Sequence, residues 1–152
     1  MSLPIIVKLA EVEKAFGEQS VLKGVTLDIP KGKITTIIGP SGEGKSVMLK
    51  HIIGLIRPDR GKIIVDGTDL TRINDRELND IRKKFAMLFQ SAALFDSMNV
   101  FDNVAFPLRE KRRATEQEIC RWVPEMLDRV GLGNMGHKFP AELSGGMKKR
   151  TG

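Results

Sequence analysis

Hydrophobic and polar positions follow two different patterns along the chain, one before and one after about residue 90. In the first part, short apolar runs end at turns rich in glycine, proline or aspartate, which is typical of β-strands. In the second part, apolar residues recur every three or four positions, which is typical of amphipathic helices. The pattern predicts a mixed β and α/β portion over about 1–90 and a helical portion over about 91–152, both belonging to one domain.

The first portion is predicted to contain strands at 5–16, 21–22, 25–29, 34–38, 62–65 and 85–89. The run 34–38 is apolar or β-branched throughout, which is the pattern of a strand buried on both faces. A helix is expected to begin in the glycine-rich stretch that follows and to end at Arg57 and Pro58. A short helix capped by Asn74 or Asp75 is expected to reach Arg82.

The second portion is predicted to contain helices over 100–108 and 115–130. Thr115 and Glu118 have the spacing of a capping box, so the second helix is expected to start there. Pro124 falls inside that helical pattern and predicts a kink or a break, because proline lacks the N–H that the helix needs.

Composition narrows the class of protein. The chain has 152 residues and is 41% hydrophobic, which suits one domain or part of one. No apolar run approaches the ~18 residues of a membrane-spanning helix, and the N-terminus has no secretory signal pattern. A single cysteine, Cys120, excludes an internal disulfide and a multi-cysteine metal site.

The charge balance favours anionic partners. The chain carries 25 Lys and Arg against 19 Asp and Glu, a net charge of +6. Nucleotide phosphates, nucleic acid and anionic membrane surfaces are the partners that such a balance attracts. The basic residues are dispersed, however, and there is no tyrosine and little aromatic surface for base stacking, so no nucleic-acid partner is expected.

One stretch carries specific chemistry, and it reads Gly39-Pro40-Ser41-Gly42-Glu43-Gly44-Lys45-Ser46. It matches the phosphate-binding pattern G-x-x-x-x-G-K-[ST] between a predicted strand and a predicted helix. Glycines let the backbone N–H groups turn inward around phosphate oxygens, and the helix N-terminus adds roughly half a positive charge. The pattern predicts that Lys45 contacts the β- and γ-phosphates of ATP and that Ser46 ligates Mg²⁺.

Two neighbours of this pattern modify it slightly. Val47 stands where many such loops have a second hydroxyl, which costs one neutral hydrogen bond of about 0.5–1.5 kcal/mol. Glu43 places a negative charge in an anion-binding loop, so its side chain is expected to point into solvent, where the repulsion is screened. Both residues are counted among those expected to surround the nucleotide.

A second motif identifies the family, and it reads Leu143-Ser144-Gly145-Gly146-Met147. It resembles the LSGGQ signature of ABC-transporter ATPases, with methionine in the fifth place. Gln90 stands where that family has its Q-loop glutamine, and Phe16 followed by Val21 resembles its base-stacking A-loop. The resemblance implies an α/β P-loop NTPase fold of ABC ATPase type, with an antiparallel β subdomain, a partial core sheet and a helical subdomain.

The resemblance also implies a role for each matching residue. Lys45 and Gln90 would be the catalytic residues, with Ser46 and Gln90 next to Mg²⁺. The ring of Phe16 would stack on the adenine beside Val21, unless it is a core phenylalanine at a strand end. Gln90 has an alternative reading as a polar residue that ends a strand.

Within the family, the signature residues face the phosphate loop of a second copy, so the resemblance implies a dimer that sandwiches ATP. Ser144, Gly145 and Gly146 would then contact nucleotide from the opposite subunit.

The stretch after Gln90 resembles ATPase subunits of Mla-type lipid transporters, also called toluene-tolerance proteins. The resemblance implies phospholipid transport in a bacterial envelope, with the subunit at the cytoplasmic face of the inner membrane. The segment after Gln90 would contact the membrane permease through apolar side chains or be core, and those side chains are Leu94, Phe95, Met98 and Phe101.

The family's catalytic machinery also includes an Asp-Glu pair after an apolar strand and a single histidine. No residues of this sequence match that pair or that histidine. His51 and His137 stand in other contexts, with His51 expected to pack or to face solvent. The chain is therefore expected to be cut short before the second half of the catalytic core. It is expected to bind ATP weakly and to hydrolyse it negligibly.

Other functions remain open on the sequence. The chain fits an ABC importer ATPase for another substrate, such as an amino acid. It also fits a non-catalytic module that uses ATP as an assembly switch, or a nucleic-acid-associated ABC protein. Nucleotide-driven dimerisation without turnover distinguishes the module, and salt-sensitive binding of RNA or DNA distinguishes the last class.

Overall fold

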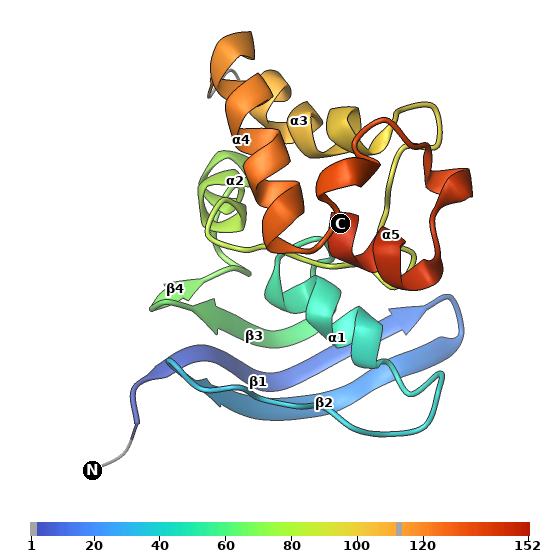
Figure 1. Cartoon of the computed structure of the whole chain (residues 1–152). Helices are drawn as coiled ribbons and strands as arrows, with labels where there is room; N and C mark the ends of the chain where they lie inside the picture. The colour runs from blue at the N-terminus through green and yellow to red at the C-terminus, as the bar shows by residue number, and fades with distance from the viewer. Residues whose placement is uncertain (1–2, 112–113) are drawn as a thin grey trace. The chain divides into compact units, whose positions relative to one another are not determined.

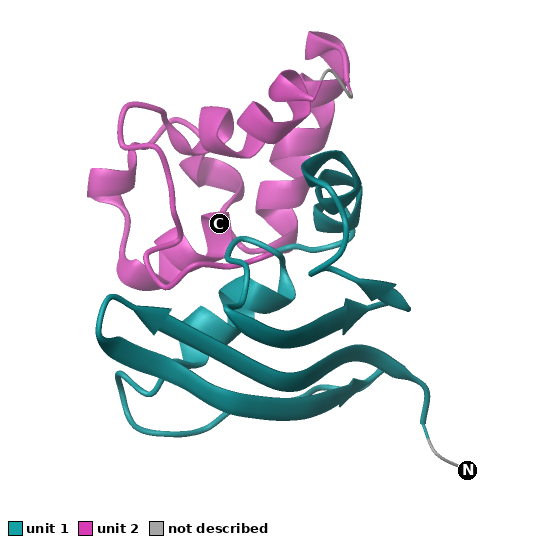
Figure 2. Cartoon of the chain, turned by 180° about the vertical axis from the view of Figure 1, so that it is seen from behind, with its two compact units in different colours: residues 1–86 teal, residues 87–152 magenta. Residues whose placement is uncertain are grey.

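A computed structural model describes residues 3–111 and 114–152 of the chain (Figure 1). The chain forms two compact units, Met1–Ala86 and Met87–Gly152 (Figure 2). Within the described residues, none of the helices has the length and apolar character that crossing a membrane requires.

The first unit is built on an antiparallel four-stranded sheet with the order β2-β1-β3-β4. Its strands are β1 (Ile5–Phe16), β2 (Gln19–Pro30), β3 (Arg60–Val65) and β4 (Thr68–Asp69). The long hairpin of β1 and β2 turns at Gly17, whose φ of 59° is easily reached by glycine. The strand pieces predicted at 21–22 and 25–29 are one continuous strand, because pairing with β1 carries β2 across the intervening Gly24.

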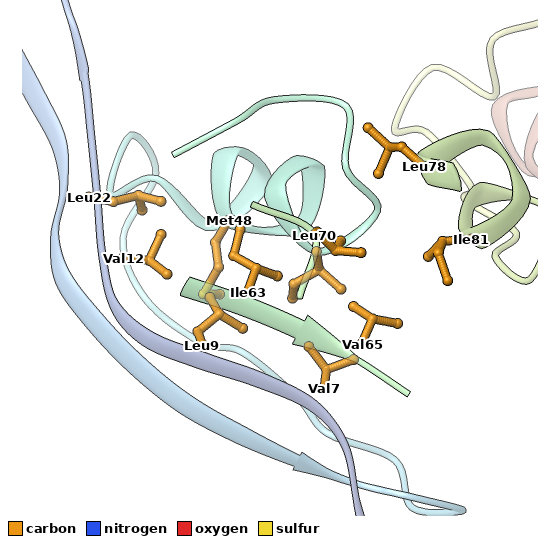
Figure 3. Close-up of a cluster of buried hydrophobic side chains, with 11 residues drawn as sticks. Val7, Leu9, Val12, Leu22, Met48, Ile63, Val65, Leu70, Leu78 and Ile81 are labelled. Atoms are coloured by element: carbon orange, nitrogen blue, oxygen red, sulfur yellow. The ribbon is translucent and has the colours of Figure 1, made fainter. Parts of the chain in front are cut away.

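The core of the first unit lies on one face of this sheet. Val7 and Leu9 of β1 point inward as alternate residues, and Leu9 is fully buried opposite Ile63 of β3. Val12, beyond a bulge, is fully buried as well. Helix α1 (Lys45–Ile52) adds Met48 and Ile52 to the same cluster (Figure 3). Burying each such side chain stabilises the fold by about 1.5–3 kcal/mol, so this cluster holds α1 on the sheet.

A bulge interrupts β1 at Glu11. This residue has a φ of 50°, and its N–H donates to the Thr26 hydroxyl over 3.1 Å. Gly61 of β3 lies against the bulge with a φ of 86°, and a β-carbon built there would lie 2.6 Å from Ala10 O and closer still to Glu11 O. The bulge therefore depends on the missing side chain at position 61.

Helix α1 ends earlier than predicted. The sequence pattern extends it to Arg57, whereas the helix stops at Ile52 and is followed by Gly54 with a φ of 70°. The turn brings Gly54 against α2 (Asp75–Arg82), where Arg82 Nη2 donates to Gly54 O over 2.5 Å. As predicted, α2 reaches Arg82 and is capped by Asn74.

The strands predicted at 34–38 and 85–89 are not formed, and this part of the prediction is wrong. Ile34 and Ile38 are instead 96% and 89% exposed. A strand exists only where a neighbour accepts its hydrogen bonds, and the described strands pair with one another rather than with either segment. The predicted burial of 34–38 on both faces is therefore wrong as well, since the described residues supply no ladder partner for this segment.

The second unit is helical, as predicted. Its elements are α3 (Val100–Glu110), α4 (Glu116–Arg129), the 3₁₀ turns Gly133–Met135 and Pro140–Glu142, and α5 (Gly145–Thr151). Its core packs α3 against α4 and the following loops through Val100, Ala105, Ile119, Val123, Leu127, Leu132 and Leu143.

Helix α4 starts at the predicted capping box of Thr115 and Glu118, but it does not break at Pro124. Pro124 and Cys120, whose carbonyl the proline leaves without an N–H, are both exposed. Water can therefore solvate the unpaired carbonyl, and the helix continues to Arg129.

Polar contacts fasten α3 to α4. Arg109 donates to both oxygens of Glu116, at 2.8 and 2.9 Å, and to Asp102 at 2.8 Å. The hydrogen bonds that Arg109 donates to Glu116 and then to Asp102 raise the pKa of Arg109, and the bond from Arg109 lowers the pKa of Glu116. The pair remains charged at neutral pH and orients the two helices.

Candidate nucleotide-binding site

The phosphate loop, residues 39–46, connects the exposed segment 34–38 to α1. Gly42 and Gly44 have φ angles of 89° and 80°, which other residues adopt at a cost. Gly44 is the N-cap of α1 and has no side chain to cap it, and the first turn of α1 contains no acidic residue. The first N–H groups of α1 and its positive dipole end are therefore directed toward a loop that suits an anion.

Gly44 is also required by packing. A β-carbon there would lie 3.0 Å from Val21 Cγ1 and 3.0 Å from Leu22 Cδ2. Close packing on β2 therefore sets the height of the loop above the sheet, and it places Val21 directly beside the loop. The sequence singled out Val21 only through its family resemblance.

The two reactive side chains of the loop differ in their surroundings. Lys45 Nζ donates to Gly39 O at 2.7 Å and to Pro40 O, so its ammonium group lies over the loop backbone. Ser46 is exposed at the start of α1. Glu43 is exposed as well, as the sequence led us to expect.

Val47 contributes to the packing of the first unit, besides any contact with nucleotide. Its side chain packs against the core of the first unit, and its carbonyl oxygen lies 2.7 Å from His51 Nδ1. A carbonyl only accepts, so Nδ1 carries the proton there. His51 is fully buried, which decides between the two readings of this residue in favour of packing.

Phe16 stands at the end of β1 with 48% of its surface exposed. It is therefore not a core phenylalanine, and a ring face is available for stacking. Lys14, on the same face of the strand, holds its Nζ over this ring at 5.6 Å from the centroid. Sequence reasoning missed Lys14, although its i, i+2 spacing from Phe16 within a strand was a usable signal.

The remaining predicted residues belong to the second unit. Gln90 is exposed and lies in a turn. Two and three residues later in the sequence, Ala92 and Ala93 have φ angles of 63° and 50°. Ser144 is the N-cap of α5, where its Oγ accepts the N–H of Met147 at 3.3 Å. A joint action of Gln90 or Ser144 with the phosphate loop stays a prediction.

Comparison with known proteins decides the family. The sequence profile of ABC transporters matches residues 22–152, which include the phosphate loop, Gln90 and the signature. The chain belongs to the ABC transporter ATPase family. Members of this family bind ATP, and the holding of a nucleotide by the phosphate loop of this chain stays a prediction.

Curated relatives divide between two named transport functions. The chain is 50% identical over 152 residues to the "Probable ribonucleotide transport ATP-binding protein mkl" of Mycobacterium leprae, covering 100% of this chain and 44% of the relative. It is 42% identical over 150 residues to the "Intermembrane phospholipid transport system ATP-binding protein MlaF" of Escherichia coli K12, covering 99% of this chain and 56% of the relative. The chain thus spans about half the length of the curated relatives it matches.

Solved structures support the fold. A bacterial ABC transporter cassette solved as a dimer, MJ0796, has a TM-score of 0.84 and 34% identity, covering 95% of this chain and 66% of that one. The same cassette in a post-hydrolysis dimer bound to ADP and Pi has a TM-score of 0.83 and 35% identity, with the same two coverages of 95% and 66%. These likenesses confirm the predicted α/β fold of ABC ATPase type.

Proposed function

We propose that this chain is the nucleotide-binding part of an ATPase subunit that powers phospholipid transport by an ABC transporter. The observation that carries the proposal is the geometry of residues 39–46, where left-handed glycines and an uncapped helix N-terminus meet the ammonium group of Lys45. Such an arrangement binds the phosphates of a nucleotide in preference to its base or sugar.

Each residue of the loop has a defined part in holding ATP. Lys45 moves from the Gly39 carbonyl to the β- and γ-phosphates, exchanging a neutral acceptor for a charged one. The N–H groups at the start of α1 donate to phosphate oxygens, and the exposed hydroxyl of Ser46 is a ligand for Mg²⁺. When bound, Mg²⁺ neutralises charge on the phosphates. Gln90 is proposed as a further residue next to the same metal.

A second copy of the chain is the proposed partner at the nucleotide. Gly145 and Gly146 are exposed at the start of α5, with no atom within 4 Å of a β-carbon built on either. Their N–H groups and the Ser144 hydroxyl therefore suit contact with a phosphate of the opposite copy. The dimeric cassettes among the structural neighbours support this arrangement.

A membrane permease is the proposed partner of the segment after Gln90. The rings of Phe95 and Phe106 lie in tilted contact, with 4.8 Å between centroids and 58° between their planes, and Phe95 is 48% exposed. They border a hollow of about 310 Å³ that Leu94 also lines. Phe101, by contrast, packs against the core of the second unit and is withdrawn from the proposed contact. Binding a permease would place the subunit at the cytoplasmic face of a bacterial inner membrane.

Asn103 holds this segment in shape. Its side-chain amide donates to the carbonyl oxygens of Phe95, Met98 and Asn99 at 2.9–3.1 Å, and its Oδ1 accepts the N–H of Phe95 at 2.8 Å. The exposed aromatic pair is thus presented by a fixed loop, which favours a specific docking contact.

Ribonucleotide transport is the second candidate, because the mycobacterial relative that carries this name is 50% identical to the chain. The two candidate transport functions are distinguished by introducing Lys45→Ala into the gene that encodes the chain. Movement of labelled phospholipid between the membranes is expected to stop, while ribonucleotide uptake stays unchanged. The reverse result supports the second candidate, and two unaffected transports contradict both. Lys50→Ala, on the same helix outside the loop, serves as the control.

A further inference from the structure

The ring of Phe16 is covered on one side by a cation. Lys14 Nζ lies over it at 5.6 Å from the centroid, within the distance of a cation–π contact. Phe16 nevertheless stays 48% exposed, so part of the ring surface away from the ammonium group is open to solvent.

Asp59 fixes the position of this cation. Its Oδ1 accepts from Lys14 Nζ at 2.6 Å, and its Oδ2 accepts the N–H of Ala15 at 2.8 Å. The N–H of Asp59 itself donates to Glu13 O at 2.9 Å. Asp59 therefore grips three consecutive residues of β1, and Lys14 is the middle one.

The surroundings keep both charges in place. The Lys14 side chain is only 17% exposed, against 47% for Asp59, so the lysine has little room to leave its position. The hydrogen bond from Lys14, and next the one from Ala15, lower the pKa of the Asp59 carboxyl. Asp59 therefore stays ionised throughout the neutral range and continues to hold the ammonium group.

We propose that Lys14, anchored by Asp59, is a positioning residue that fixes the Phe16 ring and leaves its opposite face to the nucleotide base. This inference rests on the proposed nucleotide binding and on the stacking of Phe16 on the base that the family resemblance implies. It adds that the strength of stacking depends on a residue that does not touch the nucleotide.

Lys14 can strengthen base stacking through the Phe16 ring without contacting the nucleotide. A cation on one face draws ring electron density toward itself, which favours stacking of a π-electron-rich base on the other face. Holding the ring in one orientation also lowers the ordering cost of binding. Lys14 is committed to Asp59 and to the ring, so it is not placed as a phosphate ligand.

The test compares ATP with inorganic tripolyphosphate, which has the phosphates but no base, in calorimetric titrations of the chain. Lys14→Met is expected to weaken ATP binding about two- to five-fold, from the 0.5–1 kcal/mol of an exposed cation–π contact. Tripolyphosphate affinity should stay unchanged, and Lys14→Arg should restore the affinity for ATP. Lys8→Met, the same substitution on an exposed lysine of the same strand, should alter neither ligand.

A double-mutant cycle shows whether Lys14 acts through the ring. In a Phe16→Ala background, Lys14→Met is expected to have no further effect on ATP affinity. An equal loss in that background, a loss of tripolyphosphate binding, or an unchanged ATP affinity in the single variant would each overturn the inference while leaving the proposed function intact. A wild-type chain that binds neither ligand overturns both. Melting curves of every variant establish that the fold is retained.

Discussion

Replacing Lys45 with alanine is expected to lower the affinity of the chain for ATP about 10- to 100-fold. The lysine is the one cationic side chain of the 39–46 loop, and hydrogen bonds to charged groups contribute about 1.5–3 kcal/mol. Calorimetric titration with Mg-ATP measures the change directly. Because Lys45 donates to Gly39 O and Pro40 O, a melting curve of the variant is needed to show that the loop keeps its fold.

Lys50→Ala provides the matched control, since it removes the same charge from the last turn of the same helix. Its effect on ATP affinity should stay within about two-fold, because a charge beyond the first turn is largely screened. If both variants lose the same affinity, general electrostatic attraction rather than a specific lysine–phosphate contact holds the nucleotide.

Gly61→Ala is expected to destabilise the first unit by about 2–4 kcal/mol. A methyl group there collides with the backbone carbonyls of Ala10 and Glu11, and the φ of 86° adds strain for any residue with a β-carbon. Relief requires the Glu11 bulge to move, which disturbs the pairing of β1 with β3. Urea unfolding followed by circular dichroism measures the loss.

Gly67→Ala separates the two causes. Gly67 has a φ of 79°, but a β-carbon there meets no atom within 4 Å. It should therefore cost only the conformational strain, about 1–2 kcal/mol. Equal losses for the two variants would mean that the close approach of β3 to the bulge contributes nothing.

Local signals in the sequence were sufficient for much of the fold. The capping residues Asn74 and Thr115 located two helix starts, because a side chain that accepts a helix N–H acts within a few residues of itself. The strand predicted at 62–65 likewise ends where β3 ends, at Val65, just before Asp66 and Gly67, which both have positive φ. These features depend on short-range geometry alone.

The wrong predictions concern features that depend on tertiary context, such as pairing between distant segments and exposure to solvent. The segment 34–38 has the composition of a buried strand, but hydrogen bonding to a neighbour, which composition cannot report, decides whether it forms one. Helix α1 ends just before Gly54, whose carbonyl accepts a hydrogen bond from Arg82, 28 residues away in the sequence. Pro124 was expected to interrupt α4, and only its exposure explains why the helix tolerates it.

In the candidate site, too, local motifs could be predicted from the sequence, whereas contacts between distant segments could not. The spacing of Gly39, Gly44 and Lys45 is a local motif, and the sequence alone located the phosphate loop. The contact of Val21 with Gly44 and the anchoring of Lys14 by Asp59 join separate strands and loops, and no local pattern announces them. These two contacts determine how the phosphate loop and the Phe16 ring are positioned, whereas the local motifs identify the residues that form them.

A titration series with ATP, ADP and AMP in the presence of Mg²⁺ shows whether the 39–46 loop recognises the phosphates of a nucleotide. Every phosphate removed takes away acceptors for Lys45 and for the N–H groups of α1. Affinity is therefore predicted to fall in the order ATP, ADP, AMP, with AMP at least about 10-fold weaker than ATP. AMP binding as tightly as ATP, or no binding of ATP at millimolar concentration, would mean that the loop does not recognise nucleotide phosphates.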